Sequence, residues 1–276
     1  MPPRVVDMTG PQVVDVTSPD AIERFARRDI GLHIYELGDL DPAFWPRTRW
    51  WGLAGDDGEL VALALLYDGG ETSTLLALAR DDGGAGGELL AAIGDRLPDR
   101  VHAHLGPGMV GRLVPAFAVD HHGPHRKMLL GDPAALAGVA TEDVVRLGEA
   151  DLPELLALYR RAYPGNWFDP RMLATGQYFG LHDGGQLRCV AGVHVHSPRH
   201  GVAALGNVTT DPDHRGRGLA RRTTARLCRS LLDEGVTAIG LNVRADNAAA
   251  IRCYQRLGFA IVADYDEVTL VRCPAG

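Results

Sequence analysis

Apolar and polar positions follow two clear periods along the second half of the chain. From residue 187 to 195 every second residue is apolar, which is the period of a strand with one buried face. Leu155, Leu158, Tyr159 and Ala162 recur at the spacing of one helix face. The patterns and the turn residues between them predict strands at 143–147, 177–182, 187–195, 202–210, 239–243, 259–263 and 267–272. They also predict a helix through 155–162, a helix at about 218–234, and a helix from a cap at 246 to 257.

Two helix starts in this half have residues typical of N-terminal caps. Asp151 and Glu154 form the D-x-x-E pattern of a capping box, so we expect Asp151 to cap the first helix. Asp246 stands before the last helical segment and is expected to cap it, and Gly258 is expected to end it.

The first half of the chain repeats part of this order. Trp51-Gly52-Leu53 is similar to Phe179-Gly180-Leu181, and strand-like runs at 61–67 and 72–80 precede a helical segment at 83–97. A chance similarity of short apolar strands is the alternative. We prefer a duplicated fold of the α/β (α+β) class, with domains at 1–135 and 136–276 joined by a Gly- and Pro-containing linker at 131–141.

A glycine-bearing loop joins the strand at 202–210 to the long helix. The run Arg215-Gly216-Arg217-Gly218 leads directly into the helix, whose first N–H groups lack partners and carry partial positive charge. Glycine lets the backbone approach a phosphate closely, so the loop is suited to a pyrophosphate. No Walker lysine follows and no G-x-G-x-x-G is present. A plain helix start with two turn glycines is the alternative.

A second motif lies on the last helix. Asn247, Ala250 and Tyr254 belong to the pattern N-x-x-A-x-x-x-Y-x-x-x-G-F, and their spacing places them on one helix face. Asn247 and Tyr254 can therefore point at one ligand across a shallow alanine. The alternative is an amphipathic helix with a packed tyrosine.

Both motifs and the element order resemble the GNAT-type N-acetyltransferase superfamily, in a tandem arrangement with a degenerate first copy. The resemblance implies that each domain has a mixed, mostly antiparallel central sheet flanked by helices. It also implies that acetyl-CoA is the co-substrate and that Tyr254 is the general acid that protonates the leaving thiolate. The residues implied in coenzyme binding are Val208, Thr209, Thr210, Arg215, Gly216, Arg217, Gly218, Leu219, Ala220, Asn247 and Ala250.

The general base is not fixed by the sequence. Many relatives place a glutamate on the strand before the loop, whereas this chain has Asn207 near that position. His194 and His196 share one face of the neighbouring strand and titrate in a useful range, so His194 and Asn207 join Tyr254 as candidate catalytic residues. Surface or hydrogen-bonded histidines are the alternative. Cys253 neighbours Tyr254 but points about 100° away on a helix, which disfavours a covalent role.

Two further segments bear on the acceptor. The loop at 163–170 presents Trp167 and Phe168, which either contact an apolar acceptor or seal the core. In the first half the loop at 81–87 has glycines but no arginine, and Asp81 and Asp82 would repel a pyrophosphate. We therefore expect the first half to bind no coenzyme and to shape the acceptor pocket.

Composition narrows the class of protein further. The chain has 276 residues and a net charge of −7, which disfavours nucleic-acid binding. It has no apolar run near 18 residues and no signal-peptide pattern, so we expect no membrane association and a cytoplasmic location. The four cysteines form no C-x-x-C pair, and we expect no metal.

The leading hypothesis is an enzyme that acetylates an amine of a small molecule or peptide, as a monomer or homodimer. A non-catalytic acyl-CoA-binding or sensor protein and a nucleotide-binding module are the alternatives.

Overall fold

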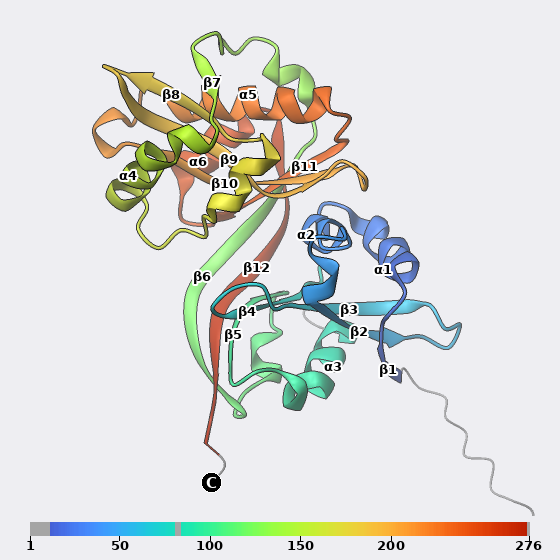
Figure 1. Cartoon of the computed structure of the whole chain (residues 1–276). Helices are drawn as coiled ribbons and strands as arrows, with labels where there is room; N and C mark the ends of the chain where they lie inside the picture. The colour runs from blue at the N-terminus through green and yellow to red at the C-terminus, as the bar shows by residue number, and fades with distance from the viewer. Residues whose placement is uncertain (1–11, 81–83, 275–276) are drawn as a thin grey trace, which may run out of the picture. The chain divides into compact units, whose positions relative to one another are not determined.

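The computed structural model describes residues 12–80 and 84–274, and the chain divides into two compact units. Unit 1 combines Met1–Asp29, Pro42–Pro124 and Asp264–Gly276, and unit 2 combines Ile30–Asp41 and His125–Ala263. Strands β6 (Phe117–Leu130) and β12 (Phe259–Arg272) contribute residues to both units (Figure 1). The two units do not coincide with the predicted domains at 1–135 and 136–276. The domain boundary between residues 135 and 136 stays a prediction.

Unit 1 contains a six-stranded mixed sheet in the order β1-β2-β3-β4-β5-β12. Every pair in it is antiparallel except β4 with β5, which are parallel and are connected through helix α3. Helix α3 packs against β2 and β3 over an apolar core (Figure 1). The bounds are β1 Gln12–Asp15, α1 Pro19–Ala26, β2 Thr48–Ala54, β3 Leu60–Tyr67, β4 Ser73–Ala77, α3 Gly84–Ile93 and β5 Arg100–Leu105.

Unit 2 contains a second sheet in the order β7-β8-β9-β10-β11-β6. Here too every pair is antiparallel except β10 with β11, which are parallel and are connected through helix α5. Helices α4 and α5 both pack against β9 and β10. The bounds are α2 Ile34–Gly38, β7 Val144–Arg146, α4 Leu152–Ala162, β8 Phe179–Asp183, β9 Gln186–Ser197, β10 Val202–Thr210, α5 Leu219–Asp233, β11 Ala238–Arg244 and α6 Ala248–Gln255.

The two sheets therefore have the same strand order and the same pairing. Strands β1 to β5 correspond to β7 to β11, and α3 corresponds to α5 as the crossover helix of the parallel pair. In each unit the sixth strand, β12 or β6, lies next to the last of these five. The predicted fold class, two mixed and mostly antiparallel sheets flanked by helices, is confirmed.

The two predicted helix caps have different outcomes. Asp151 is the N-cap residue of α4, as expected, but its carboxylate makes no cap bond and instead accepts the main-chain N–H of Gly148, at 2.8 Å, because the residues before α4 form a 3-10 turn. The last helix begins one residue later than expected, and its N-cap is Asn247, whose Oδ1 accepts the N–H of Ala250 at 3.1 Å. Asp246 forms an ion pair with Arg244 instead, at 2.7 Å.

Two other segments also differ from the prediction. The strands expected at 259–263 and 267–272 form one continuous strand, β12. The expected linker at 131–141 is not a loose connection, because it holds a 3-10 turn and buries Leu136 and Val139 in the unit 2 core.

Unit 2 also contains the short segment Ile30–Asp41 from the first half. A Cβ at Gly38 would lie 2.1 Å from Cγ1 of Val195, so glycine allows α2 to approach β9 closely. In the same segment the buried Glu36 lies 2.9 Å from Nδ1 of His33. Periodicity along the sequence did not predict this insertion. Within residues 12–80 and 84–274, no helix has both the length and the apolar character needed to cross a membrane.

Candidate active site

Two β-bulges lie on facing strands of unit 2. On β9, His194 is an extra residue, because Leu205 pairs with Val193 while its neighbour Ala204 pairs with Val195. On β10 the register shifts again between Gly206 and Thr209, which adds one residue to that strand. A bulge bends its strand and re-aims a side chain. The two candidate residues at these bulges, His194 and Asn207, are thereby set apart from the regular ladder.

Asn207 lies at the second bulge in a left-handed conformation. Its φ is +56°, the single positive φ of a non-glycine residue among those described. Its carbonyl oxygen accepts the hydroxyls of Tyr159 and Thr209, each at 3.2 Å, and its Nδ2 donates to the hydroxyl of Tyr178 at 3.1 Å. These contacts hold the left-handed conformation, which asparagine adopts more readily than most other residues with a Cβ.

His194 is half-buried beside this asparagine, and its Nε2 is a buried atom. A Cβ at Gly206 would lie 2.3 Å from Cδ2 of the imidazole, so the ring lies directly against the glycine backbone. Burial lowers the pKa of His194, and the side chain of Asn207 acts in the opposite direction. The imidazole is therefore neutral at neutral pH and is able to accept a proton. His196 is in a different setting, since its Nε2 lies 2.9 Å from Oε2 of Glu234.

The loop before α5 leaves a series of main-chain donors available. Gly216 and Gly218 have φ of +78° and +77°, which glycine adopts without strain. Helix α5 begins after Gly218 without a side-chain cap. Among the described residues, none accepts a hydrogen bond from the N–H groups of residues 216–220. Together with the partial positive charge of a helix start, these donors form a site for an anion.

Arginine side chains add positive charge to this loop. Arg217 lies 3.7 Å from Asp183 in an exposed ion pair, and Arg222 pairs with Asp143. Nε of Arg221, in the first turn of α5, is a buried atom with no hydrogen-bond partner among the described residues. A buried guanidinium nitrogen without a partner is costly, and a bound phosphate oxygen would satisfy it.

A buried carboxylate fixes the point where β10 turns into this loop. Asp211 accepts hydrogen bonds from Arg161 and Arg188, both at 2.7 Å, and from the N–H of Asp213. Burial alone would raise the pKa of Asp211, but these bonds outweigh it and lower the pKa to about 2. Asp211 is therefore ionised at neutral pH. The sequence motifs did not single out this residue, although its place directly after a strand and before a proline indicates a turn.

Strands β10 and β11 pair over only the first part of β10 and then separate. Their parallel pairing covers residues 202–205 and 238–241, and it stops at the pair Leu205 and Leu241. Strand β10 continues to Thr210 without a partner on that edge, so main-chain groups of Val208 and Thr209 are not used in a ladder with β11. An extended ligand arm can pair with such an edge.

Tyr254 lies on α6, and its ring packs at 6.0 Å from that of Phe259. Burial raises the pKa of Tyr254, and the thiols of Cys253 and Cys189 act in the same direction. The phenol is therefore protonated at neutral pH, and its hydroxyl forms no hydrogen bond with any other described residue. Asn247 is the helix cap and Ala250 is half-buried on the same helix.

Trp167 and Phe168, in the aromatic loop at 163–170, lie in different environments. The Phe168 ring packs between those of Tyr159 and Tyr178, with centroids 5.2 and 5.6 Å away, so it belongs to the core. Trp167, in contrast, is 51% exposed. Sequence reasoning did not identify Tyr159 and Tyr178, which hold Asn207. The expected acidic loop of the first half begins at Asp81 and Asp82, which lie outside the described residues.

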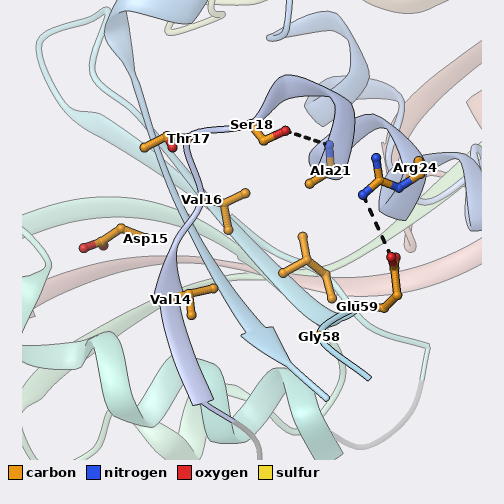
Figure 2. A pocket seen from close by; sticks show the side chains of 10 residues that line it. Val14, Asp15, Val16, Thr17, Ser18, Ala21, Arg24, Gly58 and Glu59 are labelled. Atoms are coloured by element: carbon orange, nitrogen blue, oxygen red, sulfur yellow. Dashed lines mark hydrogen bonds and ion pairs between the residues drawn. The ribbon is translucent and has the colours of Figure 1, made fainter. Parts of the chain in front are cut away.

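One hollow of about 250 Å³ lies away from these residues, in unit 1. It is bordered by β1, the start of α1 and the turn before β3, and Figure 2 shows Arg24 facing Glu59 across it, at 3.9 Å. Both of these side chains are about half exposed. None of the candidate catalytic or coenzyme-binding residues lines this hollow.

Comparison with known proteins identifies the class. Residues 146–259 match the model of the Acetyltransferase (GNAT) family. The chain is 31% identical over 243 residues to a mycothiol acetyltransferase of Rhodococcus jostii (strain RHA1), covering 74% of this chain and 77% of that protein. It is 34% identical over 118 residues to the [ribosomal protein bS18]-alanine N-acetyltransferase of Escherichia coli (strain K12), covering 41% and 77% of the two chains.

A solved structure shares the fold over nearly the whole chain. It is a tandem GNAT protein from the clavulanic acid biosynthesis pathway, with a TM-score of 0.53 and 17% identity, covering 97% of this chain and all of the other, 100%. At this identity the likeness shows the fold alone. The sequence relatives and the family model show that the chain belongs to the GNAT family of acetyltransferases.

Proposed function

We propose that this protein is an N-acetyltransferase that moves an acetyl group from acetyl-CoA to a primary amine by direct attack. The proposal rests mainly on the main-chain N–H groups of residues 216–220, at the start of α5, which donate to no acceptor among the described residues. The buried Nε of Arg221 adds a further donor without a partner. A pyrophosphate supplies the acceptors that both need.

The adjoining strand edge suits the rest of the coenzyme. With the pyrophosphate at the loop, the pantetheine arm follows β10 along the edge that β11 leaves unpaired after Leu205. Val208 and Thr209 offer main-chain groups there, and Asn247 and Ala250 lie on the neighbouring helix. We propose that a main-chain N–H near Val208 stabilises the oxyanion of the tetrahedral intermediate.

Proton transfer is assigned to the half-buried His194 and the buried Tyr254. His194 is neutral because burial lowers its pKa, and it removes the proton from the attacking amine. Tyr254 keeps its proton because burial raises its pKa, and it protonates the departing thiolate. Asn207 cannot act as a base, because a side-chain carboxamide does not take up a proton near neutral pH, and its Nδ2 donates to the hydroxyl of Tyr178. We propose that it positions His194 and the bulge.

The acceptor class follows the relatives and the exposed Trp167. One relative is named for mycothiol, a small molecule, and another for an alanine of a ribosomal protein. We propose a small-molecule or peptide amine with an apolar part that contacts Trp167, which is 51% exposed.

A thiol-release assay tests this function directly. The purified chain is incubated with acetyl-CoA and a panel of small amines and of peptides with an N-terminal alanine, and free CoA is measured. We expect turnover with at least one acceptor. Calorimetry with CoA and with ATP adds a second reading, in which CoA binds and ATP does not displace it. Tight CoA binding without turnover across the panel would favour a sensor, and displacement of CoA by ATP would favour a nucleotide-binding module.

A further inference from the structure

Unit 1 holds a cluster of two histidines and one glutamate on the face of its sheet away from α3. His102 and His104 stand two residues apart on β5, so both side chains project from the same face of the strand. The residues between and beside them, Val101, Ala103 and Leu105, are fully buried in the core under α3. The histidines therefore lie on the face opposite that core.

The C-terminal strand brings the carboxylate to the same place. In the antiparallel pairing of β5 with β12, Glu267 stands directly opposite His104, and Thr269 stands opposite His102. Directly opposed side chains in such a pair lie about 4.5–5.5 Å apart at Cβ. The pairing thus fixes the glutamate beside both imidazoles by backbone geometry, without depending on long flexible side chains.

The ligand atoms lie close to the spacing that a single metal ion requires. Nε2 of His102 lies 3.3 Å from Oε1 of Glu267, and Nε2 of His104 lies 3.7 Å from Oε2. One ligand atom from each residue lies within 4.8 Å of the other two. Around a tetrahedral zinc ion with bonds of about 2.0–2.2 Å, neighbouring ligand atoms lie roughly 3.4 Å apart. Small rotations of the side chains bring all three onto one ion.

The cluster is also enclosed and oriented. The exposed fractions of the three side chains are 10%, 13% and 19% for His102, His104 and Glu267, whereas unpaired surface charges are far more exposed. The ring of Tyr265 packs at 4.9 Å from that of His104, and its hydroxyl lies 3.5 Å from Oε2 of Glu267. His122 lies against His102 at 5.6 Å. Neighbours of this kind fix the orientation of metal ligands.

We propose that unit 1 binds one divalent transition-metal cation of the zinc class through Nε2 of His102, Nε2 of His104 and the carboxylate of Glu267. Two imidazoles and one carboxylate are a donor set typical of zinc sites that keep an open fourth position for water. The ion ties the C-terminal strand β12 to β5. This inference concerns unit 1 alone and does not depend on the proposed acetyl transfer. It departs from the sequence-based expectation of no metal, which considered only cysteine spacing.

Zinc binding to the full-length chain tests the proposal. Protein without a polyhistidine tag is stripped with a chelator and titrated with ZnCl₂ by calorimetry. We expect one ion per chain, a rise in thermal midpoint on saturation, and visible absorption bands when Co²⁺ replaces Zn²⁺. Glu267→Gln and the double change His102→Ala with His104→Ala are expected to weaken binding by more than the roughly 10- to 100-fold typical of changes outside a ligand set.

His121→Ala is the matched control, because His121 is exposed on neighbouring β6 and is expected to leave zinc affinity unchanged. Circular dichroism checks that each variant folds. If the wild-type chain binds neither Zn²⁺ nor Co²⁺, the cluster is a hydrogen-bonded network and the proposal is wrong, whatever the variants do. Equal binding by wild type and both ligand variants, or equal loss in the His121 control, also overturns it.

Discussion

Replacing Tyr254 with phenylalanine removes the proposed acid while keeping the ring. General acid catalysis contributes about 10²- to 10⁴-fold to a rate, so Tyr254→Phe should lower kcat by that factor. At about 1.36 kcal/mol for each tenfold, the loss of transition-state stabilisation is roughly 2.7 to 5.4 kcal/mol. The hydroxyl binds no other described residue and the ring contact with Phe259 remains, so the free energy of unfolding should change by less than about 1 kcal/mol.

The assay is initial-rate thiol release with saturating acceptor, together with calorimetry of CoA. Because the phenol acts only in the transition state, the affinity for CoA should stay within about twofold of wild type while kcat falls. Because burial raises the pKa of Tyr254, the wild-type rate should show no alkaline loss from this group below about pH 10. Tyr67→Phe, on β3 of unit 1, is the control and should retain activity. A kcat for Tyr254→Phe equal to that of the control would refute the assignment.

Three more changes test the loop, its anchor and the base. Gly218→Val forces a branched residue to φ +77°, which costs about 1–2 kcal/mol. Calorimetry should therefore show roughly 5- to 30-fold weaker CoA binding. An unchanged affinity would argue against coenzyme binding at this loop. Asp211→Asn should lower the free energy of unfolding by about 2 kcal/mol in denaturant titrations, because two buried charged bonds are lost. Since the folded pKa of Asp211 lies below its unfolded value, this contribution is present above about pH 4 and is lost toward pH 2, so the gap between wild type and variant should close there. Gly206→Ala places a Cβ 2.3 Å from the ring of His194 and should lower kcat/KM by at least about 10²-fold. The fall in kcat/KM that wild type shows below pH 6.5, where His194 becomes protonated, should also be lost. A variant with the wild-type pH profile would exclude His194 as the base.

The regular parts of the fold were predictable because each depends on local periodicity. The alternation at 187–195 matches β9, and the predicted strand at 202–210 has the bounds of β10. The bulges that set His194 and Asn207 apart were not predictable, because they arise from how β9 pairs with β10 and leave no mark in the apolar pattern. The positive φ of Asn207 likewise depends on hydroxyls from distant residues.

The sequence patterns also did not predict which distant segments of the chain pack together. A linear reading assigns residues 30–41 to the first half and 264–272 to the second, whereas the compact units exchange them. The same exchange places Glu267 beside His102 and His104, which no spacing rule connects. The helical spacing of Asn247 and Tyr254 was informative, although Asn247 proves to be the cap of its own helix.

A crystal structure of the chain with bound CoA is the most direct measurement of the central claim. It should place pyrophosphate oxygens within about 3 Å of main-chain nitrogens in the segment 216–220 and close to the guanidinium of Arg221. A coenzyme whose phosphates lie on another element, with those N–H groups hydrogen-bonded to the protein's own side chains, would contradict it.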